Sequence, residues 1–295
     1  MFEYMGYSIA PWGLDIVVYF FLIGTAGMTF VYAAAPAVFG SVFNGAAKSM
    51  LPFQKVGMVI SLVLLVICLP LLITDLGQPG RFFYPIIYFH WTSPISWGSL
   101  FLPLFGLCII GFIFASTNEN AGLMRTTGIL GSLLALSMPL YTGLDLMVNQ
   151  TRELWNNPTI PLLFVILSMS SGTAVVAVTQ LSRGQLNQKA SEFLHVFLYI
   201  SLGVTFALFL AEWVVLNYGT GEEQQAWEII NRQFGFSYWG LTFLIGILIP
   251  LAMIAVPKLG RKPTVLTVAA VLSAVGAYTF REVLIYAGQL TQIDF

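Results

Sequence analysis

The sequence predicts an all-α integral membrane protein whose eight transmembrane helices form two four-helix bundles. Of the 295 residues, 58% are hydrophobic and 8% are charged, whereas soluble domains carry about 25% charged residues. Eight apolar runs are each long enough to cross a bilayer. The segment WGSLFL at 97–102 also matches WGLTFL at 239–244, and each opens a span that starts from the same face. This repetition favours two related halves.

The spans follow one another through short connections. A helix needs about 20 apolar residues to cross the hydrocarbon core, and the first four runs meet this length at 13–38, 56–74, 95–115 and 127–148. The next four runs meet it at 159–181, 193–216, 238–256 and 264–287. The first run is a span and not a signal peptide, because no Lys or Arg precedes it. The connections contain the turn formers Gly, Pro, Asn and Ser, so residues 1–295 are predicted to form one membrane domain.

The distribution of basic residues predicts the orientation. With eight spans, both termini lie on one side of the membrane, and the connections on the other side carry eight basic residues: Lys48, Lys55, Arg125, Arg183, Lys189, Lys258, Arg261 and Lys262. The side that holds the termini carries three, which are Arg81, Arg152 and Arg232. Because Lys and Arg are retained in the cytoplasm, both termini are predicted to lie outside.

Acidic residues show the opposite bias. Five of them lie at or near the outward ends of different spans: Asp15, Asp75, Asp145, Glu212 and Glu282. Arg281 lies at the same depth. Ionisable groups are costly inside a bilayer and usually face a wet cavity or the interior of a bundle, so this outward cluster is a candidate functional site. The alternative is that these residues are interfacial and extend toward water from the helix ends.

Composition and motifs exclude several classes of function. A formal net charge of −1 gives no general reason to bind nucleic acid. Cys68 and Cys108 lie in separate apolar runs, and the predicted topology puts His90 and His195 on opposite sides of the membrane. The chain therefore lacks the ligand sets for a bis-histidine haem, for an iron-sulfur cluster and for a metal site. No phosphate-binding loop, dinucleotide fingerprint or metalloprotease motif occurs in a usable context, which argues against a self-contained enzyme.

Five segments carry a resemblance to a known family. They are DLGQPGRFF at 75–83, SPISWGSLF at 93–101, YTGLDL at 141–146, LWNNPTIPLLF at 154–164 and REVLIYAGQ at 281–289. In this order they resemble the NrfD/PsrC-like membrane subunits of polysulfide reductase and related respiratory complexes. The resemblance implies an eight-helix anchor in a prokaryotic cytoplasmic membrane that binds a quinone, either menaquinone or ubiquinone. It also implies a four-cluster ferredoxin-like iron-sulfur partner and a molybdopterin catalytic subunit on the outer face.

The resemblance also implies roles for individual residues. Tyr141 matches the tyrosine that contacts the quinone head group, and Asp75 with Arg81 matches the loop motif beside it. Arg281 and Gln289 match the motif of the last span. The family's first span often supplies a His or Asn to the quinone. Here Asp15 is the polar residue near that position, which is a departure from the pattern.

The chemistry of quinol oxidation suggests a role for each residue of the outward cluster. Two protons and two electrons are released, so the site needs a hydrogen-bond donor such as Tyr141 or Arg281 and a proton acceptor such as Asp75 or Asp145. Glu212 and Glu282 complete the predicted quinone-binding set. Two other functions stay open at this point. One is a secondary transporter or ion channel, although its site would lie near the midplane and not toward one face. The other is a scaffold subunit that binds no quinone.

Overall fold

The computed structural model describes residues 12–40, 43–75, 79–219 and 221–290. The helices of the first half are α1 (Leu14–Phe39), η1 (Phe43–Met50), α2 (Leu51–Asp75), η2 (Pro79–Arg81), α3 (Tyr84–Ile87), α4 (Pro94–Thr117) and α5 (Ala121–Met147). Those of the second half are α6 (Thr159–Ser182), α7 (Gln188–Tyr218), α8 (Gly221–Gln233), η3 (Phe236–Leu248), α9 (Ile249–Ala255), α10 (Pro257–Gly260) and α11 (Pro263–Leu290). Within these residues there is no β-strand.

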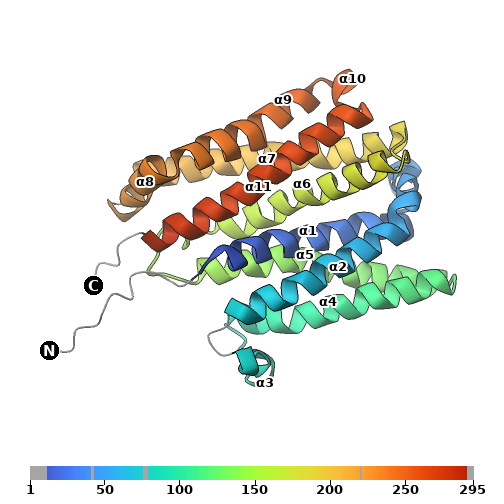
Figure 1. Ribbon diagram of the computed structural model, residues 1–295, viewed down its shortest axis with the longest axis horizontal. Helices are drawn as coiled ribbons and strands as arrows, with labels where there is room; N and C mark the ends of the chain where they lie inside the picture. The colour runs from blue at the N-terminus through green and yellow to red at the C-terminus, as the bar shows by residue number, and fades with distance from the viewer. Residues whose placement is uncertain (1–11, 41–42, 76–78, 220, 291–295) are drawn as a thin grey trace.

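The eight long helices form two bundles that lie side by side (Figure 1). The first bundle contains α1, α2, α4 and α5, and the second contains α6, α7, α11 and the helix made by η3 and α9. The bundles meet where α1 and α5 pack against α6 and where α1 also contacts α11. Among the described residues, eight helical segments are long and apolar enough to span a membrane. The predicted all-α fold with eight spans is therefore confirmed.

Small residues let the central helices approach closely. A Cβ atom added to Gly27 of α1 would lie 2.5 Å from the carbonyl oxygen of Ala135 in α5. A Cβ atom on Gly172 of α6 would lie 2.5 Å from the Cβ atom of Met28 in α1. Lipid is as apolar as these side chains, so helix association in a membrane depends on such tight packing. Gly27 therefore sets the approach of α1 to α5 within the first bundle, and Gly172 sets the contact between the two bundles.

The two ends of the molecule differ in charge. The predicted set of eight basic residues lies on the elements around η1, α10 and the connections at their end of the bundles (Figure 1). The other end holds α3, α8 and the described ends of α1 and α11 (Figure 1). The polar stretch between α7 and η3 is the amphipathic helix α8, which buries Ala226 and Ile230. It lies across one end of the second bundle and covers it.

The seventh span departs from regular α-helical geometry. It begins as η3, whose 13 residues form a wider π-type helix, and continues as α9. A single wide turn is common at functional sites, and a longer stretch is unusual. Gly246 in this segment packs directly against Gly276 of α11, so the two backbones touch. The first turn of η3 presents Tyr238 and Trp239 toward α7 and α8.

Candidate functional site

A pair of buried tyrosines lies inside the first bundle. The hydroxyl groups of Tyr19 on α1 and Tyr141 on α5 are hydrogen-bonded to each other. The Tyr141 ring lies directly against Gly98 of α4, where any Cβ atom would collide with it. Three helices therefore fix the position of one phenol group. A pair of hydroxyls has two protons and shares only one, so the other proton is available to a third group.

A carboxylate lies one helical turn from this pair. Asp145 follows Tyr141 by four residues on α5, and residues with this spacing share one face of a helix. Asp145 is half-buried and interacts electrostatically with Tyr141. The Asn149 side chain donates a hydrogen bond of 2.7 Å to the Asp145 carbonyl oxygen, which leaves the Asp145 carboxyl group outside that bond. The first bundle therefore combines a hydroxyl donor and a proton acceptor.

The first bundle also carries an apolar groove. It lies between α2 and α4 and has a volume of about 370 Å³. Leu65 and Leu69 of α2 form one wall, while Ser99, Leu102 and Pro103 of α4 form the other. Gly98 and the two tyrosines do not line this groove, which lies on another face of α4. Its chemistry suits a flexible hydrocarbon chain.

Arg281 is the most deeply buried cation of the described residues. Its side chain has 0% exposure and extends from α11 toward α6. The guanidinium donates to the Ala277 carbonyl at 2.7 Å, and to the Phe164 carbonyl and the Ser168 hydroxyl at 3.0 Å each. It also lies 4.8 Å from the centre of the Phe164 ring. These bonds make Arg281 a clamp between α6 and α11, and they leave its Nε atom without a partner.

Aromatic rings separate the arginine from the tyrosine pair. The Phe164 ring under Arg281 packs 5.8 Å from the ring of Phe20, whose neighbour in sequence is Tyr19. Ser168 also lies against Gly24 of α1. The arginine is therefore close to the first bundle, but its hydrogen bonds go to α6 and α11. Its predicted contact with a quinone head group stays a prediction.

Glu212 belongs to a second polar group, in the other bundle. Its Oε2 atom accepts a hydrogen bond of 2.7 Å from Asn157 and one of 2.6 Å from Thr159. Tyr238 of η3 lies close enough to interact electrostatically with it. The structure therefore puts Glu212 with α6, α7 and η3, whereas Tyr141 and Asp145 lie in the first bundle.

Three other predicted residues lie where α1 meets α11. Gln289 donates 2.8 Å and 3.2 Å hydrogen bonds to the carbonyls of Trp12 and Ile285, so it ties the two helix ends together. Glu282 is half-buried and interacts with the tyrosines one turn away on either side. Asp15 is exposed in the first turn of α1 and interacts with the second of these tyrosines.

The loop motif after α2 is only partly described. Asp75 is the last residue of α2, and its side chain lies outside the described part of the structure. Arg81 is exposed in η2 and lies 5.5 Å from the ring of Tyr84. The predicted pairing of this acid with this arginine is not tested by these contacts.

Sequence reasoning missed Tyr19 and Tyr238. Tyr19 lies four residues after Asp15, on the same face of the first span, so its spacing was a usable signal. Tyr238 was visible only as a residue at the start of a span. Across the described residues, no three side chains of His, Cys, Asp or Glu are grouped closely enough to hold a metal ion.

Comparison with known proteins decides the family. The profile described as "Polysulphide reductase, NrfD" matches residues 3–293. The chain belongs to the NrfD family. The resemblance predicted from the five segments is thereby confirmed, and this NrfD-family chain is a multi-pass membrane protein.

Its relatives cover nearly the whole chain. The NrfD homolog of Haemophilus influenzae is 26% identical over 311 residues, with 95% of each chain covered. Protein NrfD of Escherichia coli K12 is 24% identical over 312 residues, also with 95% of each chain covered. An Hdr-like menaquinol oxidoreductase integral membrane subunit of Archaeoglobus fulgidus is 22% identical over 293 residues, covering 95% of this NrfD-family chain and 71% of that protein.

Proposed function

We propose that this chain is the quinone-binding membrane anchor of a respiratory oxidoreductase and passes electrons between quinol and an iron-sulfur partner. The observation that carries the proposal is the buried hydroxyl pair of Tyr19 and Tyr141 with Asp145 one turn away. A relative that is named as a menaquinol oxidoreductase membrane subunit supports the same class of ligand. The ligand is menaquinone or ubiquinone, since the donor set suits either.

The residues fit the chemistry of a quinone in two respects. The free proton of the hydroxyl pair can be donated to a carbonyl oxygen of the head group. The apolar groove between α2 and α4 offers a surface for an isoprenoid tail. A bound quinol supplies two electrons and two protons.

Side chains of this chain bind the head group and accept the protons that the quinol releases. Tyr141 orients the head group through its hydroxyl, and Tyr19 holds that hydroxyl in place. Asp145 is the acceptor for a released proton, because it is the ionisable group next to the pair in the first bundle. Asp75 is proposed as a second acceptor, and Arg81 as its partner in the loop. The protons leave on the side that holds the termini.

The chain holds no redox centre of its own in this proposal, so electrons leave to a partner. We infer a four-cluster ferredoxin-like subunit, joined to a molybdopterin catalytic subunit, on the face that carries α3 and α8. The bias of basic residues toward the opposite end supports an outward position for this face in a prokaryotic cytoplasmic membrane. A reporter fused at Phe295 should be active only in its exterior-sensing form. A fusion that is active in the cytoplasm would reverse the orientation.

The experiment that tests the function compares two tyrosines of the same environment. Tyr141→Phe should lower quinol turnover of the assembled complex by about tenfold, because it removes a hydrogen bond worth roughly 0.5–1.5 kcal/mol. The control is Tyr32→Phe on α1, whose buried hydroxyl bonds to Thr173 at 2.8 Å near the other end of the bundle. It should leave turnover unchanged. Full quinol turnover in Tyr141→Phe would overturn the proposed site.

A further inference from the structure

Two buried polar atoms without a hydrogen-bond partner face one small space in the second bundle. They are the Oε1 atom of Glu212 on α7 and the hydroxyl of Tyr238 on η3. The other buried side-chain atoms without a partner among the described residues of this bundle belong to residues that do not line the space: Gln180, Thr205, Ser273 and Arg281. The Glu212 and Tyr238 side chains are each 2% exposed, and both line the same small space between α7, η3, α8, α11 and Leu154 of the loop before α6. A buried polar group without a partner is unfavourable, so the space calls for a ligand that both atoms can bind.

The size of the space selects the ligand. It offers about 10 Å³ to the centre of a water-sized sphere, which is the room that one water molecule needs. The rest of its wall is apolar and includes Leu216, Ile230 and Phe280. A water molecule that donates to Glu212 and accepts from the Tyr238 hydroxyl would satisfy both atoms at once.

The other oxygen of the carboxyl group is already held in place. Asn157 and Thr159 donate to Oε2 at 2.7 Å and 2.6 Å, which directs Oε1 toward the space. Among the described residues, no salt bridge joins Glu212 to a basic side chain. The carboxyl group is therefore neutralised by no cation of the protein and can change its charge by binding a proton.

The group lies close to one face of the membrane. Glu212 is six residues before the end of α7, which is about 9 Å along a helix. Helix α8 closes the space from that face: Ile230 lines it, and the Trp227 ring packs edge-on at 5.7 Å from Tyr238. Glu223 of α8 interacts electrostatically with Glu212, and Glu153 lies close to Glu222 and Glu223. These acidic side chains lie between the aqueous phase and the buried Glu212 carboxyl group, and a proton can pass along them.

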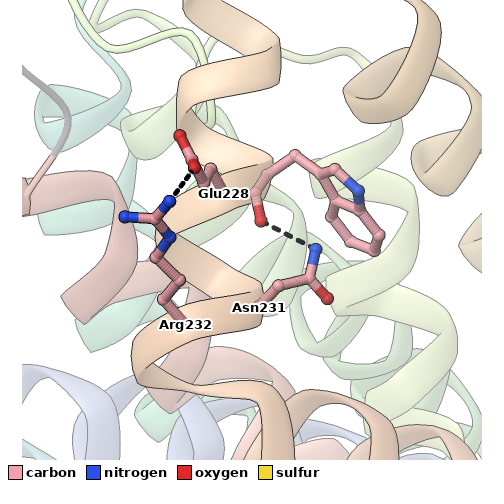
Figure 2. A network of polar contacts seen from close by, with 4 residues as sticks. Glu228, Asn231 and Arg232 are labelled. Carbon is pink, nitrogen blue, oxygen red and sulfur yellow. Dashed lines mark hydrogen bonds and ion pairs between the residues drawn. The ribbon is translucent and has the colours of Figure 1, made fainter.

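One side chain of α8 attaches this helix to η3. Figure 2 shows two contacts within α8, which are the ion pair between Glu228 and Arg232 and the 3.0 Å bond from the Asn231 side chain to the Trp227 carbonyl. Asn231 also accepts a bond of 3.0 Å from the Trp239 indole of η3. The helix that covers the space is thereby attached to the helix that carries Tyr238.

We propose that one water molecule bridges Glu212 and Tyr238, and that this group is a proton-exchange site open to the face that holds the termini. One proton from that aqueous phase is added to Oε1 of the Glu212 carboxylate. An O–H bond forms there, the side chain changes from charge −1 to neutral, and the reverse step returns the proton to the same phase. The bridging water and the Tyr238 hydroxyl keep their own protons at the end of each transfer.

Charged and titratable groups approach this space from several elements. On the loop that contributes Leu154, Arg152 donates to the Gly288 carbonyl of α11, and Glu153 lies near Glu222 and Glu223. Tyr238 faces the space from η3, and Glu223 approaches from α8. On α11, Arg281 is directed to α6, while Glu282 interacts with Tyr278 and Tyr286. Helix α9 has no titratable side chain, and η1 has only Lys48, at the opposite end. The site is independent of the tyrosine pair in the first bundle, so its failure would leave the quinone proposal intact.

Infrared difference spectroscopy of the full chain in lipid nanodiscs tests the proposal. A pH step should produce a carboxylic acid carbonyl band that shifts in D₂O, disappears in Glu212→Gln and shifts in Tyr238→Phe. The control is Glu192→Gln, at the exposed opposite end of α7, which should keep the band unchanged. Heavy-oxygen water should shift one water O–H band in the wild type and not in Tyr238→Phe.

Several results would overturn the proposal. A band that persists in Glu212→Gln would assign the proton to another group. A band that Tyr238→Phe leaves unmoved would remove the bridging water. A band that responds to replacement of sodium by potassium would mean a metal cation site. If either variant fails to fold, a high-resolution map of the wild-type complex decides: one water density between the two side chains supports the proposal, and an empty space contradicts it.

Discussion

Gly98 provides the sharpest test of how the first bundle positions its tyrosine pair. A Cβ atom at this position would lie 2.6 Å from Cδ2 and 2.7 Å from Cζ of Tyr141. Ordinary carbon contacts are about 3.5–4.0 Å, so the ring in Gly98→Ala must move by about 1 Å. Overpacking of this kind destabilises a protein by about 1–3 kcal/mol. The same movement carries the Tyr141 hydroxyl away from Tyr19.

The functional effect of that movement should exceed its effect on stability. A misplacement of about 1 Å at a positioning group can lower turnover by about 100-fold. We therefore expect Gly98→Ala to lower quinol turnover per assembled complex more strongly than Tyr141→Phe, which keeps the ring in place. Turnover is measured with quinol and an artificial acceptor on purified complex, and stability by thermal unfolding in detergent.

The matched control for this prediction is Gly203→Ala on α7. No atom lies within 4 Å of a Cβ atom added to Gly203. The change should stabilise the helix by roughly 0.5–1 kcal/mol and leave turnover unchanged. Assembled Gly98→Ala complex with wild-type turnover would refute the claim that the Tyr141 ring must sit where it does.

Three further predictions concern other contacts of the site and its surroundings. Tyr19→Phe should lower kcat/KM for quinol by about fivefold, and adding Tyr141→Phe should cost little more because the two hydroxyls act as one unit; additive losses would contradict this. Gly288→Ala should destabilise the protein by about 1–3 kcal/mol in thermal unfolding, because its Cβ atom would lie 2.6 Å from Cε2 of Trp155 and closer still to Nε1 of the same ring; an unchanged unfolding temperature would count against this packing. Burial and the neighbouring carboxylates of α8 raise the pKa of Glu153 above its ordinary value of 4.5. The folded protein therefore favours the protonated Glu153 side chain. This effect stabilises the folded state fully below pH 4.5 and is lost as the pH rises through the raised pKa. Glu153→Gln should therefore flatten the pH dependence of the unfolding temperature in this window, and an unaltered slope would argue against the effect.

The eight spans were predictable because lipid imposes a simple length rule. The fifth span was expected at 159–181 and is Thr159–Ser182. The fourth was expected at 127–148 but begins earlier, at Ala121, because Asn120 caps the helix by accepting a 3.0 Å bond from the Leu123 amide. Apolar length measures the part of a helix inside the bilayer, whereas the cap determines where the helix starts.

Long-range side-chain pairs could not be predicted in the same way. The four-residue spacing of Tyr141 and Asp145 was readable from the sequence, since it follows helical periodicity. The pairing of Tyr19 with Tyr141 depends on how α1 packs against α5, which no single sequence reveals. Likewise, the ionisable residues near one end of the spans were predicted to form one cluster, but the direction that each faces depends on the rotation of its helix. Glu212 lies toward η3 and Arg281 toward α6. The sequence of a single span does not reveal this direction.

Photolabelling with an azidoquinone tests the central claim most directly. The assembled complex is irradiated with the probe, and the labelled peptides are identified by mass spectrometry with and without excess natural quinone. Labelling that excess quinone suppresses should lie on the peptides of α1, α4 and α5 that contain Tyr19, Gly98 and Tyr141. Competed label confined to the second bundle, for example near His195, would contradict the proposed site.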